Sequence, residues 1–283
     1  MKISVIGGDR RAVLLAGLLL RDGERLRSFA LEKADLPEEI PRSEHLQAAL
    51  YGADAVILPL PAEKGGLLNA PYANLPCRME EVCEALWPGQ LVFGGMFSDG
   101  LRLWALSHGL QLVDWMRQPG FVLGNAALTA EGAVGLLLQE SERSLFGSRA
   151  LVSGFGRIGR LLAGKLRALG AAVTVAARRE ESRAEAEALG YDAASFDALP
   201  GGFDFVINTV PERVLGEGFL CCLPETALLL ELASAPGGYD RNLAENLGLR
   251  CLAAPGLPGR SAPRTAAELM RREMRRVIEE ERE

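Results

Sequence analysis

Histidine is nearly absent from this sequence. His45 and His108 are the only two, and none follows residue 108. A dehydrogenase of hydroxy acids needs a positioned acid or base to move the hydroxyl proton, most often a histidine, and a Ser-His-Asp hydrolase needs one as well. The scarcity therefore weighs against simple alcohol–ketone chemistry and against such a hydrolase. Both histidines are interpreted as surface or capping residues.

Cysteine is also scarce and has no pattern that binds metal. There are five cysteines, an odd number, without Cys-x-x-Cys or histidine-paired spacing. A disulfide framework and a zinc site are therefore not expected, and the cysteines are interpreted as small buried apolar residues. We expect no metal.

The sequence lacks an excess of positive charge and, on inspection, any apolar run near the length of a membrane span. The formal net charge is −6, so no electrostatic footprint for nucleic acid is present. A span needs about 20 apolar residues, and the first apolar stretch stops at Gly7 and Gly8. We expect a cytoplasmic protein that binds neither nucleic acid nor membrane.

Short apolar runs alternate with amphipathic segments along the whole chain, which is typical of parallel sheets covered by helices. The first series predicts strands at Ile3–Ile6, Leu26–Leu31, Ala53–Leu58, Leu91–Phe93 and Leu110–Val113, with helices at Asp9–Leu20, Ser43–Leu50, Arg78–Leu86 and Gly100–Ser107. The second predicts strands at Ala150–Ser153, Ala172–Ala176, Phe205–Asn208, Thr226–Glu231 and Leu249–Leu252, with helices at Gly156–Leu169, Glu181–Leu189 and Tyr239–Leu247.

The predicted fold is two tandem Rossmann-like, doubly wound α/β domains joined by bridging helices. The 283 residues are ample for two domains. The apolar helix Gly124–Glu140 and the C-terminal helix Thr265–Arg282 are the expected bridges. The predicted domains are 1–123 with the C-terminal helix 264–283, and 124–263.

The sharpest motif is the G-x-G-x-x-G segment formed by Gly154, Phe155, Gly156, Arg157, Ile158 and Gly159. It follows a predicted strand and opens a predicted helix, which is the context a dinucleotide fingerprint requires. The first glycine permits a tight turn, the second leaves room for a pyrophosphate, and the third allows close packing of helix on strand. The motif predicts a nicotinamide cofactor at the helix N-terminus.

The next strand ends at Ala177, Arg178 and Arg179, where a protein specific for NAD usually carries an acidic residue. Arginine suits an additional phosphate, so the pair favours NADP, although exposed charges beside NAD would give the same sequence. The following strand ends in Asn208, Thr209, Val210 and Pro211. We expect these four residues to lie along the nicotinamide half of the cofactor.

Three further segments are candidates for binding an acidic small molecule between the domains. The first strand–helix turn offers Gly8, Asp9 and Arg10; a capped helix with arginines in solvent is an equally good interpretation. The loop that precedes the C-terminal helix offers Pro258, Gly259, Arg260, Ser261, Arg264 and Thr265, although it could be a plain connection. Pro59, Asn125 and Thr129 complete the candidate substrate residues. No catalytic residue is assigned.

Four motifs together resemble the A subunits of dipicolinate synthase over nearly the whole chain. They are Ile6–Arg11, the pair Asn125-Ala126 with Thr129–Gly132, the glycine motif Gly154–Gly159, and Pro255–Gly259 with Ala262-Pro263 and Thr265-Ala266. The resemblance implies oxidation of dihydrodipicolinate to dipicolinate with NADP. It also implies a partner, the flavoprotein-like B subunit, in a homo- or hetero-oligomer, and the mother cell of a sporulating bacterium as the location.

Two alternatives remain open at this point. One is an NAD(P)-dependent dehydrogenase of another small hydroxy or amino acid. The other is a regulatory protein that binds NADP without catalysis.

Overall fold

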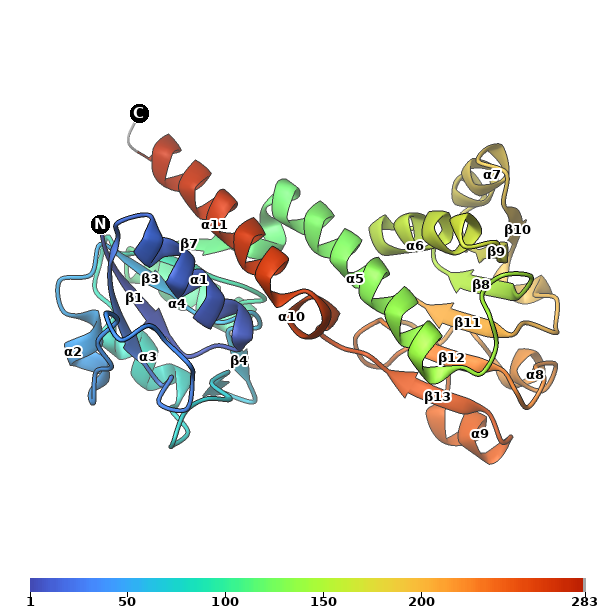
Figure 1. The fold of residues 1–283 in the computed structure, drawn as a ribbon, viewed down its shortest axis with the longest axis horizontal. Helices are drawn as coiled ribbons and strands as arrows, with labels where there is room; N and C mark the ends of the chain where they lie inside the picture. The colour runs from blue at the N-terminus through green and yellow to red at the C-terminus, as the bar shows by residue number, and fades with distance from the viewer. Residues whose placement is uncertain (282–283) are drawn as a thin grey trace. The chain divides into compact units, whose positions relative to one another are not determined.

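The computed structural model describes residues 1–281 and divides them into two compact α/β units (Figure 1). The first unit consists of Met1–Asn125 and the segment that begins at Ala262, and the second is Ala126–Ser261. Each unit has one parallel sheet with helices on both faces, so the predicted fold class of two tandem Rossmann-like domains is confirmed. Arg282 and Glu283, which the sequence assigned to the C-terminal helix, lie outside the described residues.

The sheet of the first unit has the strand order β2-β1-β3-β6-β7, and all its pairings are parallel. Its strands are β1 (Lys2–Ile6), β2 (Arg25–Phe29), β3 (Ala55–Ile57), β6 (Leu91–Gly94) and β7 (Gln111–Asp114). A small antiparallel hairpin, β4 (Glu63–Lys64) with β5 (Leu67–Leu68), was not predicted because each strand has only two residues. The 3₁₀ helix η1 (Trp115–Arg117) follows β7.

Helices of the first unit cover both faces of this sheet. The helices α1 (Arg10–Arg21) and α11 (Pro263–Glu280) bury apolar side chains on one face, with Trp115 and Phe121. The helices α2 (Leu46–Leu50), α3 (Met79–Ala85) and α4 (Asp99–Ser107) cover the other. The predicted helix at Ser43–Leu50 is therefore wrong in its first turn, because α2 begins only at Leu46 and its N-terminal residue His45 makes no side-chain cap.

The sheet of the second unit has the order β10-β9-β8-β11-β12-β13, again entirely parallel. Its strands are β8 (Arg149–Ser153), β9 (Ala172–Ala176), β10 (Asp192–Ala194), β11 (Phe205–Asn208), β12 (Leu228–Glu231) and β13 (Arg250–Ala253). The helices α5 (Pro119–Glu140), α6 (Arg157–Ala168) and α7 (Glu180–Ala188) contribute to one face of its core. The short helix α8 (Glu217–Leu220) and α9 (Arg241–Asn246) contribute to the other, and the 3₁₀ helix η2 (Phe196–Ala198) follows β10.

The segment 254–265, expected to be a loop, contains the short helix α10 (Leu257–Ser261). Pro258 is tolerated there because it lies in the first turn, where its missing N–H has no helical partner to lose. Expecting a loop was therefore wrong for Leu257–Ser261, and also for Pro263 and Arg264, which form the start of α11.

The helix α5 corrects the expectation that no apolar segment reaches the length of a membrane span. Its 22 residues are long and apolar enough by length and composition, although half of the most apolar window is buried in the structure. A buried core helix of a soluble protein gives the same signal, and α5 contributes Ala130, Ala133 and Leu137 to the core of the second unit. The signal is therefore weak evidence for a span.

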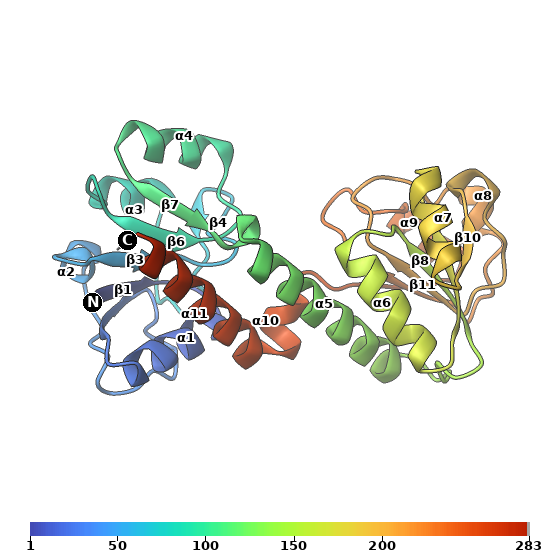
Figure 2. The same ribbon diagram turned by 90° about the horizontal axis from the view of Figure 1, so that it is seen from above.

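Ion pairs hold α11 against α1 in the first unit, where the two helices lie side by side (Figure 1 and Figure 2). Asp22, at the C-terminal end of α1, lies 3.0 Å from Arg271 Nε and 2.7 Å from Arg275 Nη2. A carboxylate is unfavourable at a helix C-terminus because it faces the negative end of the dipole. The two guanidinium groups compensate for it, and Met270, Met274 and Val277 bury the apolar face of α11.

This arrangement predicts that Asp22→Asn weakens the attachment of α11. Loss of two partly buried ion pairs should cost about 1 kcal/mol. Hydrogen exchange followed by mass spectrometry should therefore show faster exchange in α11 than in the wild type. Asp35→Asn, which removes an exposed carboxylate that has no ion pair among the residues described, is the control. Equal protection of α11 in both variants would show that the ion pairs do not hold the helix.

Candidate functional site

The loops after β8, β9 and β11 lie at one edge of the sheet in the second unit, because all these strands run parallel. The strand order reverses between β8 and β11, the central pair. Open α/β sheets bind ligands at the carboxyl ends of their strands, at such a reversal. The predicted cofactor residues all belong to these three loops or to the strand ends and helix that adjoin them.

Two glycines of the motif make a turn that no other residue type would fit at their positions. Gly154 has a φ of +94°, and a Cβ there would lie 2.5 Å from Thr209 Oγ1. A Cβ on Gly159 would lie 2.1 Å from the carbonyl oxygen of Gly154. The first and third glycines are therefore required by the protein itself, because they let α6 approach β8 and the loop after β11.

Gly156 differs from the other two glycines of the motif. A Cβ at this position would meet no protein atom within 4 Å, and its φ of −83° is open to any residue. No side chain caps the N-terminus of α6, which begins at Arg157. The first N–H groups of a helix have no partner within it, so this end offers N–H donors and free space together, as a pyrophosphate requires.

The remaining motif residues support the turn or lie in solvent. Phe155 is buried and its carbonyl accepts a hydrogen bond of 2.9 Å from Arg160 Nε. Arg160 also pairs with Glu185 of α7 at 2.6 Å. Ile158 is half-buried, whereas Arg157 is exposed and has no ion pair among the residues described.

The end of β9 presents its two arginines to solvent while Ala177 is buried. Arg183 fixes this turn by donating to the carbonyl oxygens of Ala177 (2.9 Å) and Arg178 (2.7 Å). Arg178 forms an ion pair of 2.5 Å with Glu212, in the loop after β11. Arg179 is the N-terminal flanking residue of α7.

Asn208 is wholly buried at the end of β11, and its amide is fully used within the protein. Its Nδ2 donates to Val210 O (2.8 Å) and to Glu231 Oε1 (2.6 Å), and its Oδ1 accepts from Val210 N (3.2 Å). The structure therefore gives Asn208 the task of shaping the loop, which leaves Val210 half-exposed and Pro211 exposed. Thr209 Oγ1 donates to Ser153 O at 2.7 Å, which ties the loop to the glycine turn.

Glu231, the last residue of β12, has a role that was not predicted from the sequence. Its carboxylate accepts from Asn208, from Ala233 N (2.9 Å) and from Gly238 N (2.8 Å). A Cβ on Gly238 would lie 2.3 Å from the Asn208 side chain, so this glycine is required for the approach. The sequence feature that could have identified Glu231 is a carboxylate residue at the end of a buried strand, followed closely by Gly237 and Gly238.

In the first unit, the turn after β1 is closed by its own side chains. Asp9 caps α1 by accepting from Arg11 N (2.9 Å), and the buried Arg11 pairs with Asp9 (2.8 Å) and donates to the carbonyl of Leu60. Arg10 is exposed and has no ion pair among the residues described. The expected cap at Asp9 is confirmed, whereas the expectation that both arginines lie in solvent is wrong for Arg11, which is buried.

The other candidate substrate residues divide between the units. Gly8 and Pro59 are buried at the carboxyl ends of β1 and β3, while Arg264 and Thr265 are exposed in the first turn of α11. In the second unit, Pro258 is buried, Gly259 half-buried and Arg260 exposed. Ser261 Oγ donates to Leu257 O at 2.9 Å. On α5, Asn125 is half-buried in the first unit and Thr129 is buried in the second.

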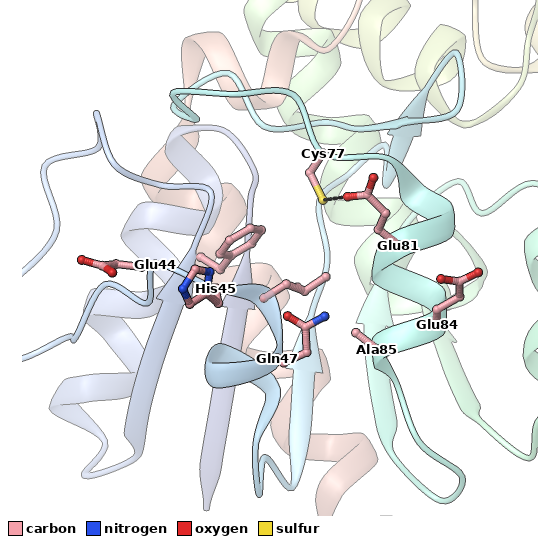
Figure 3. A pocket seen from close by; sticks show the side chains of 9 residues that line it. Glu44, His45, Gln47, Cys77, Glu81, Glu84 and Ala85 are labelled. Atoms are coloured by element: carbon pink, nitrogen blue, oxygen red, sulfur yellow. Dashed lines mark hydrogen bonds between the residues drawn. The ribbon is translucent and has the colours of Figure 1, made fainter.

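A separate cavity of about 510 Å³ lies in the first unit and is lined by residues of α2 and α3 (Figure 3). Glu44, Glu81 and Glu84 are among its lining residues, and Cys77 Sγ lies 3.9 Å from Glu81 Oε2. Burial and the nearby Glu81 carboxylate raise the pKa of the Cys77 thiol. Within residues 1–281, no group of three or more His, Cys, Asp or Glu side chains is arranged to hold a metal ion.

Comparison with known proteins gives a match for each part of the chain. Residues 2–116 match the family described as the N-terminal domain of the dipicolinate synthase A subunit. Residues 128–233 match the NAD-binding domain of D-isomer specific 2-hydroxyacid dehydrogenases. The second unit is therefore a nicotinamide-dinucleotide-binding domain.

The chain is similar over its whole length to the dipicolinate synthase A subunit of Bacillus subtilis (strain 168), with 29% identity over 99% of this chain and 96% of that protein. The crystal structure of that enzyme's A chain from Bacillus subtilis has a TM-score of 0.86 at 28% identity and covers 99% and 96% of the two chains. The A subunit from Bacillus halodurans has a TM-score of 0.84 at 26% identity, covering 98% and 97%. The resemblance indicated by the sequence motifs is confirmed, and the comparisons support an NAD(P)-dependent oxidoreductase.

The geometry of the glycine turn predicts different results for its second and third glycines. Gly156→Ala should retain the stability of the wild type, because the new Cβ meets no protein atom, yet it should weaken nicotinamide dinucleotide binding at least about tenfold by occupying phosphate space. Gly159→Ala should destabilise the unit because its Cβ collides with a carbonyl oxygen. Thermal unfolding and calorimetric titration measure the two effects.

Gly164→Ala is the matched control, since Gly164 lies on the same helix and a Cβ there would make only an ordinary contact of 3.7 Å. It should leave affinity unchanged and stabilise the helix by about 0.5–1 kcal/mol. Gly156→Ala binding as tightly as Gly164→Ala would place the pyrophosphate elsewhere.

Proposed function

We propose that this chain oxidises dihydrodipicolinate to dipicolinate with NADP, acting as the A subunit of a dipicolinate synthase. The observation that carries the proposal is the similarity to the A subunit of that enzyme over 99% of the chain, which includes the N-terminal unit and not only the widespread dinucleotide-binding domain. A dehydrogenase of another small hydroxy or amino acid would share the dinucleotide-binding domain, but it would have no reason to share the N-terminal domain of the dipicolinate synthase A subunits.

The chain's own residues fit a nicotinamide dinucleotide. The N–H groups at the start of α6 and the open space beside Gly156 would hold the pyrophosphate. Arg178 and Arg179 would hold the 2′-phosphate that distinguishes NADP, because no acidic residue occupies the end of β9 to favour the unmodified ribose. Thr209, Val210 and Pro211 would border the nicotinamide half, with Asn208 holding their backbone in place.

The substrate carries two carboxylates, so exposed cations are the groups expected to bind it. Arg10, Arg260 and Arg264 are exposed arginines at or near strand or helix ends, and none has an ion pair among the residues described. Gly8, Asp9 and Pro59 shape the turn beside Arg10, and Ser261 and Thr265 accompany Arg260 and Arg264. We assign the three arginines to carboxylate recognition and the residues beside them to shaping their surroundings.

The reaction needs little help from a protein base. Bound NADP supplies a hydride acceptor. Loss of a hydride and a proton turns the dihydropyridine into an aromatic ring. The aromatic stabilisation of the product favours the reaction and makes the proton easier to remove. This accounts for a chain in which no histidine follows residue 108. The residues of this chain then bind and orient the reactants, and no proton acceptor is assigned.

The proposal extends to a partner and a location. A flavoprotein-like B subunit would complete the enzyme, in a homo- or hetero-oligomer. The cytoplasm of the mother cell of a sporulating bacterium is the proposed location.

The direct test is an absorbance assay of purified chain, alone and with a B subunit, supplied with freshly generated dihydrodipicolinate. We expect reduced nicotinamide and dipicolinate to form in equal amounts, faster with NADP than with NAD. The absence of cofactor reduction with both subunits present would refute the proposal, as would equal rates with other small hydroxy or amino acids.

Arg260→Gln should raise KM for dihydrodipicolinate about 10- to 150-fold with little change in kcat, because a lost charge-assisted contact to a carboxylate costs about 1.5–3 kcal/mol of uniform binding. Arg272→Gln, at an arginine of α11 with 64% exposure, is the control. Equal KM values for the two variants would remove Arg260 from the carboxylate site.

Arg178→Gln should weaken NADP binding about tenfold and change NAD binding less than about twofold, because only NADP offers a phosphate to this arginine. Calorimetric titration with each nucleotide measures the ratio. Arg241→Gln, from an exposed ion pair with Glu245 at 2.7 Å, controls for the loss of a positive charge from the same unit. A proportional loss of NAD and NADP affinity would contradict the assignment.

A further inference from the structure

A cavity of about 440 Å³ lies next to Arg178 in the second unit. It is lined by Arg178, Ser195, Phe196, Asp197, Arg213, Val214 and Gly216. These residues come from the loops after β9, β10 and β11, three loops at the carboxyl edge of the parallel sheet. The cavity thus occupies the side of the ligand-binding edge that lies beyond the glycine turn, toward β9 and β10.

Arg213 brings a second guanidinium group to this cavity. Its place could not be predicted from the sequence motif after β9, because Arg213 lies in a different loop, the one that follows β11. Arg213 Nη1 donates to the carbonyl of Tyr239, a buried residue. One side of the guanidinium is therefore anchored, which reduces the entropy lost when the remaining donors bind an anion.

Glu212 opposes an anion at the same place. Its carboxylate pairs with Arg178 at 2.5 Å, and both side chains are exposed, at 59% and 69%. A phosphate that binds Arg178 must displace this carboxylate or share the guanidinium with it. An exposed ion pair contributes only about 0–1 kcal/mol, so a dianionic phosphate can replace it.

We infer that the cavity receives the phosphorylated ribose of the dinucleotide, that Arg213 joins Arg178 and Arg179 in binding its phosphate, and that Glu212 is a specificity-determining residue that competes with the phosphate. This inference rests on the proposed use of NADP and names the residues that set the preference. Glu212 lowers the affinity for the phosphorylated nucleotide in two ways: it occupies Arg178, and it repels the phosphate. Its carboxylate can also accept a hydrogen bond from the hydroxyl of an unphosphorylated ribose. The competition reduces the preference that the arginines create.

The test measures Kd for NADP and for NAD by calorimetric titration of the full chain and three variants. Glu212→Gln should bind NADP about fivefold more tightly, since it releases Arg178 and removes the repulsion. Its affinity for NAD should be unchanged or lower. Arg213→Gln should bind NADP about tenfold more weakly and leave NAD within about twofold. Glu245→Gln, which removes a carboxylate from an exposed ion pair on α9, should change neither.

The same Kd measurements are then made with adenosine 2′,5′-bisphosphate and with AMP, which lack the nicotinamide. The same shifts for the bisphosphate, and none for AMP, would support the inference by locating the effect at the 2′-phosphate. The inference would be overturned if the wild type prefers NADP and the ratio of Kd for NAD to Kd for NADP is the same in Glu212→Gln and Arg213→Gln. That result would leave the proposed function intact. A wild type that binds neither nucleotide would overturn both.

Discussion

The approach of α6 to β8 is the constraint on which the cofactor-binding unit depends. A Cβ on Gly159 would lie 2.1 Å from the Gly154 carbonyl, so the helix can start this close to the strand only with glycine there. This contact aims the uncapped N-terminus of α6 at the carboxyl edge of the sheet. Beside it, Gly156 borders open space that no protein atom fills. Packing fixes the conformation of the turn, and the unfilled space beside Gly156 can hold a pyrophosphate.

Buried and half-buried polar groups hold the other loops of the candidate sites through hydrogen bonds within the protein. Glu231 binds the Asn208 amide and two backbone N–H groups. Arg11 binds Asp9 and the Leu60 carbonyl in the first unit. Buried polar networks that are fully satisfied make the surrounding backbone rigid. Residues such as Thr209 and Arg10 are thereby presented on defined backbone, so substitutions of the buried groups would alter the sites indirectly.

The sequence predicted the sheets well because buried parallel strands are short apolar runs and the helices between them are amphipathic, as for Phe205–Asn208 and Gly156–Leu169. The glycine motif could be predicted because its spacing is local in the sequence: Gly154 and Gly159 are required by packing, and Gly156 leaves space beside the helix N-terminus. The role of Glu231, the pairing of Arg178 with Glu212 and the place of Arg213 depend on contacts between distant loops, which periodicity does not encode. The helix α10 escaped prediction because Pro258 and Gly259 disfavour helices except in a first turn or a short segment.

The most direct measurement of the central claim is a crystal structure of the chain with NADP. The account predicts pyrophosphate density against the N-terminus of α6 beside Gly156, and the 2′-phosphate within hydrogen-bond distance of Arg178. Density for the nucleotide at any other place, or an empty glycine turn in crystals grown at saturating NADP, would contradict it.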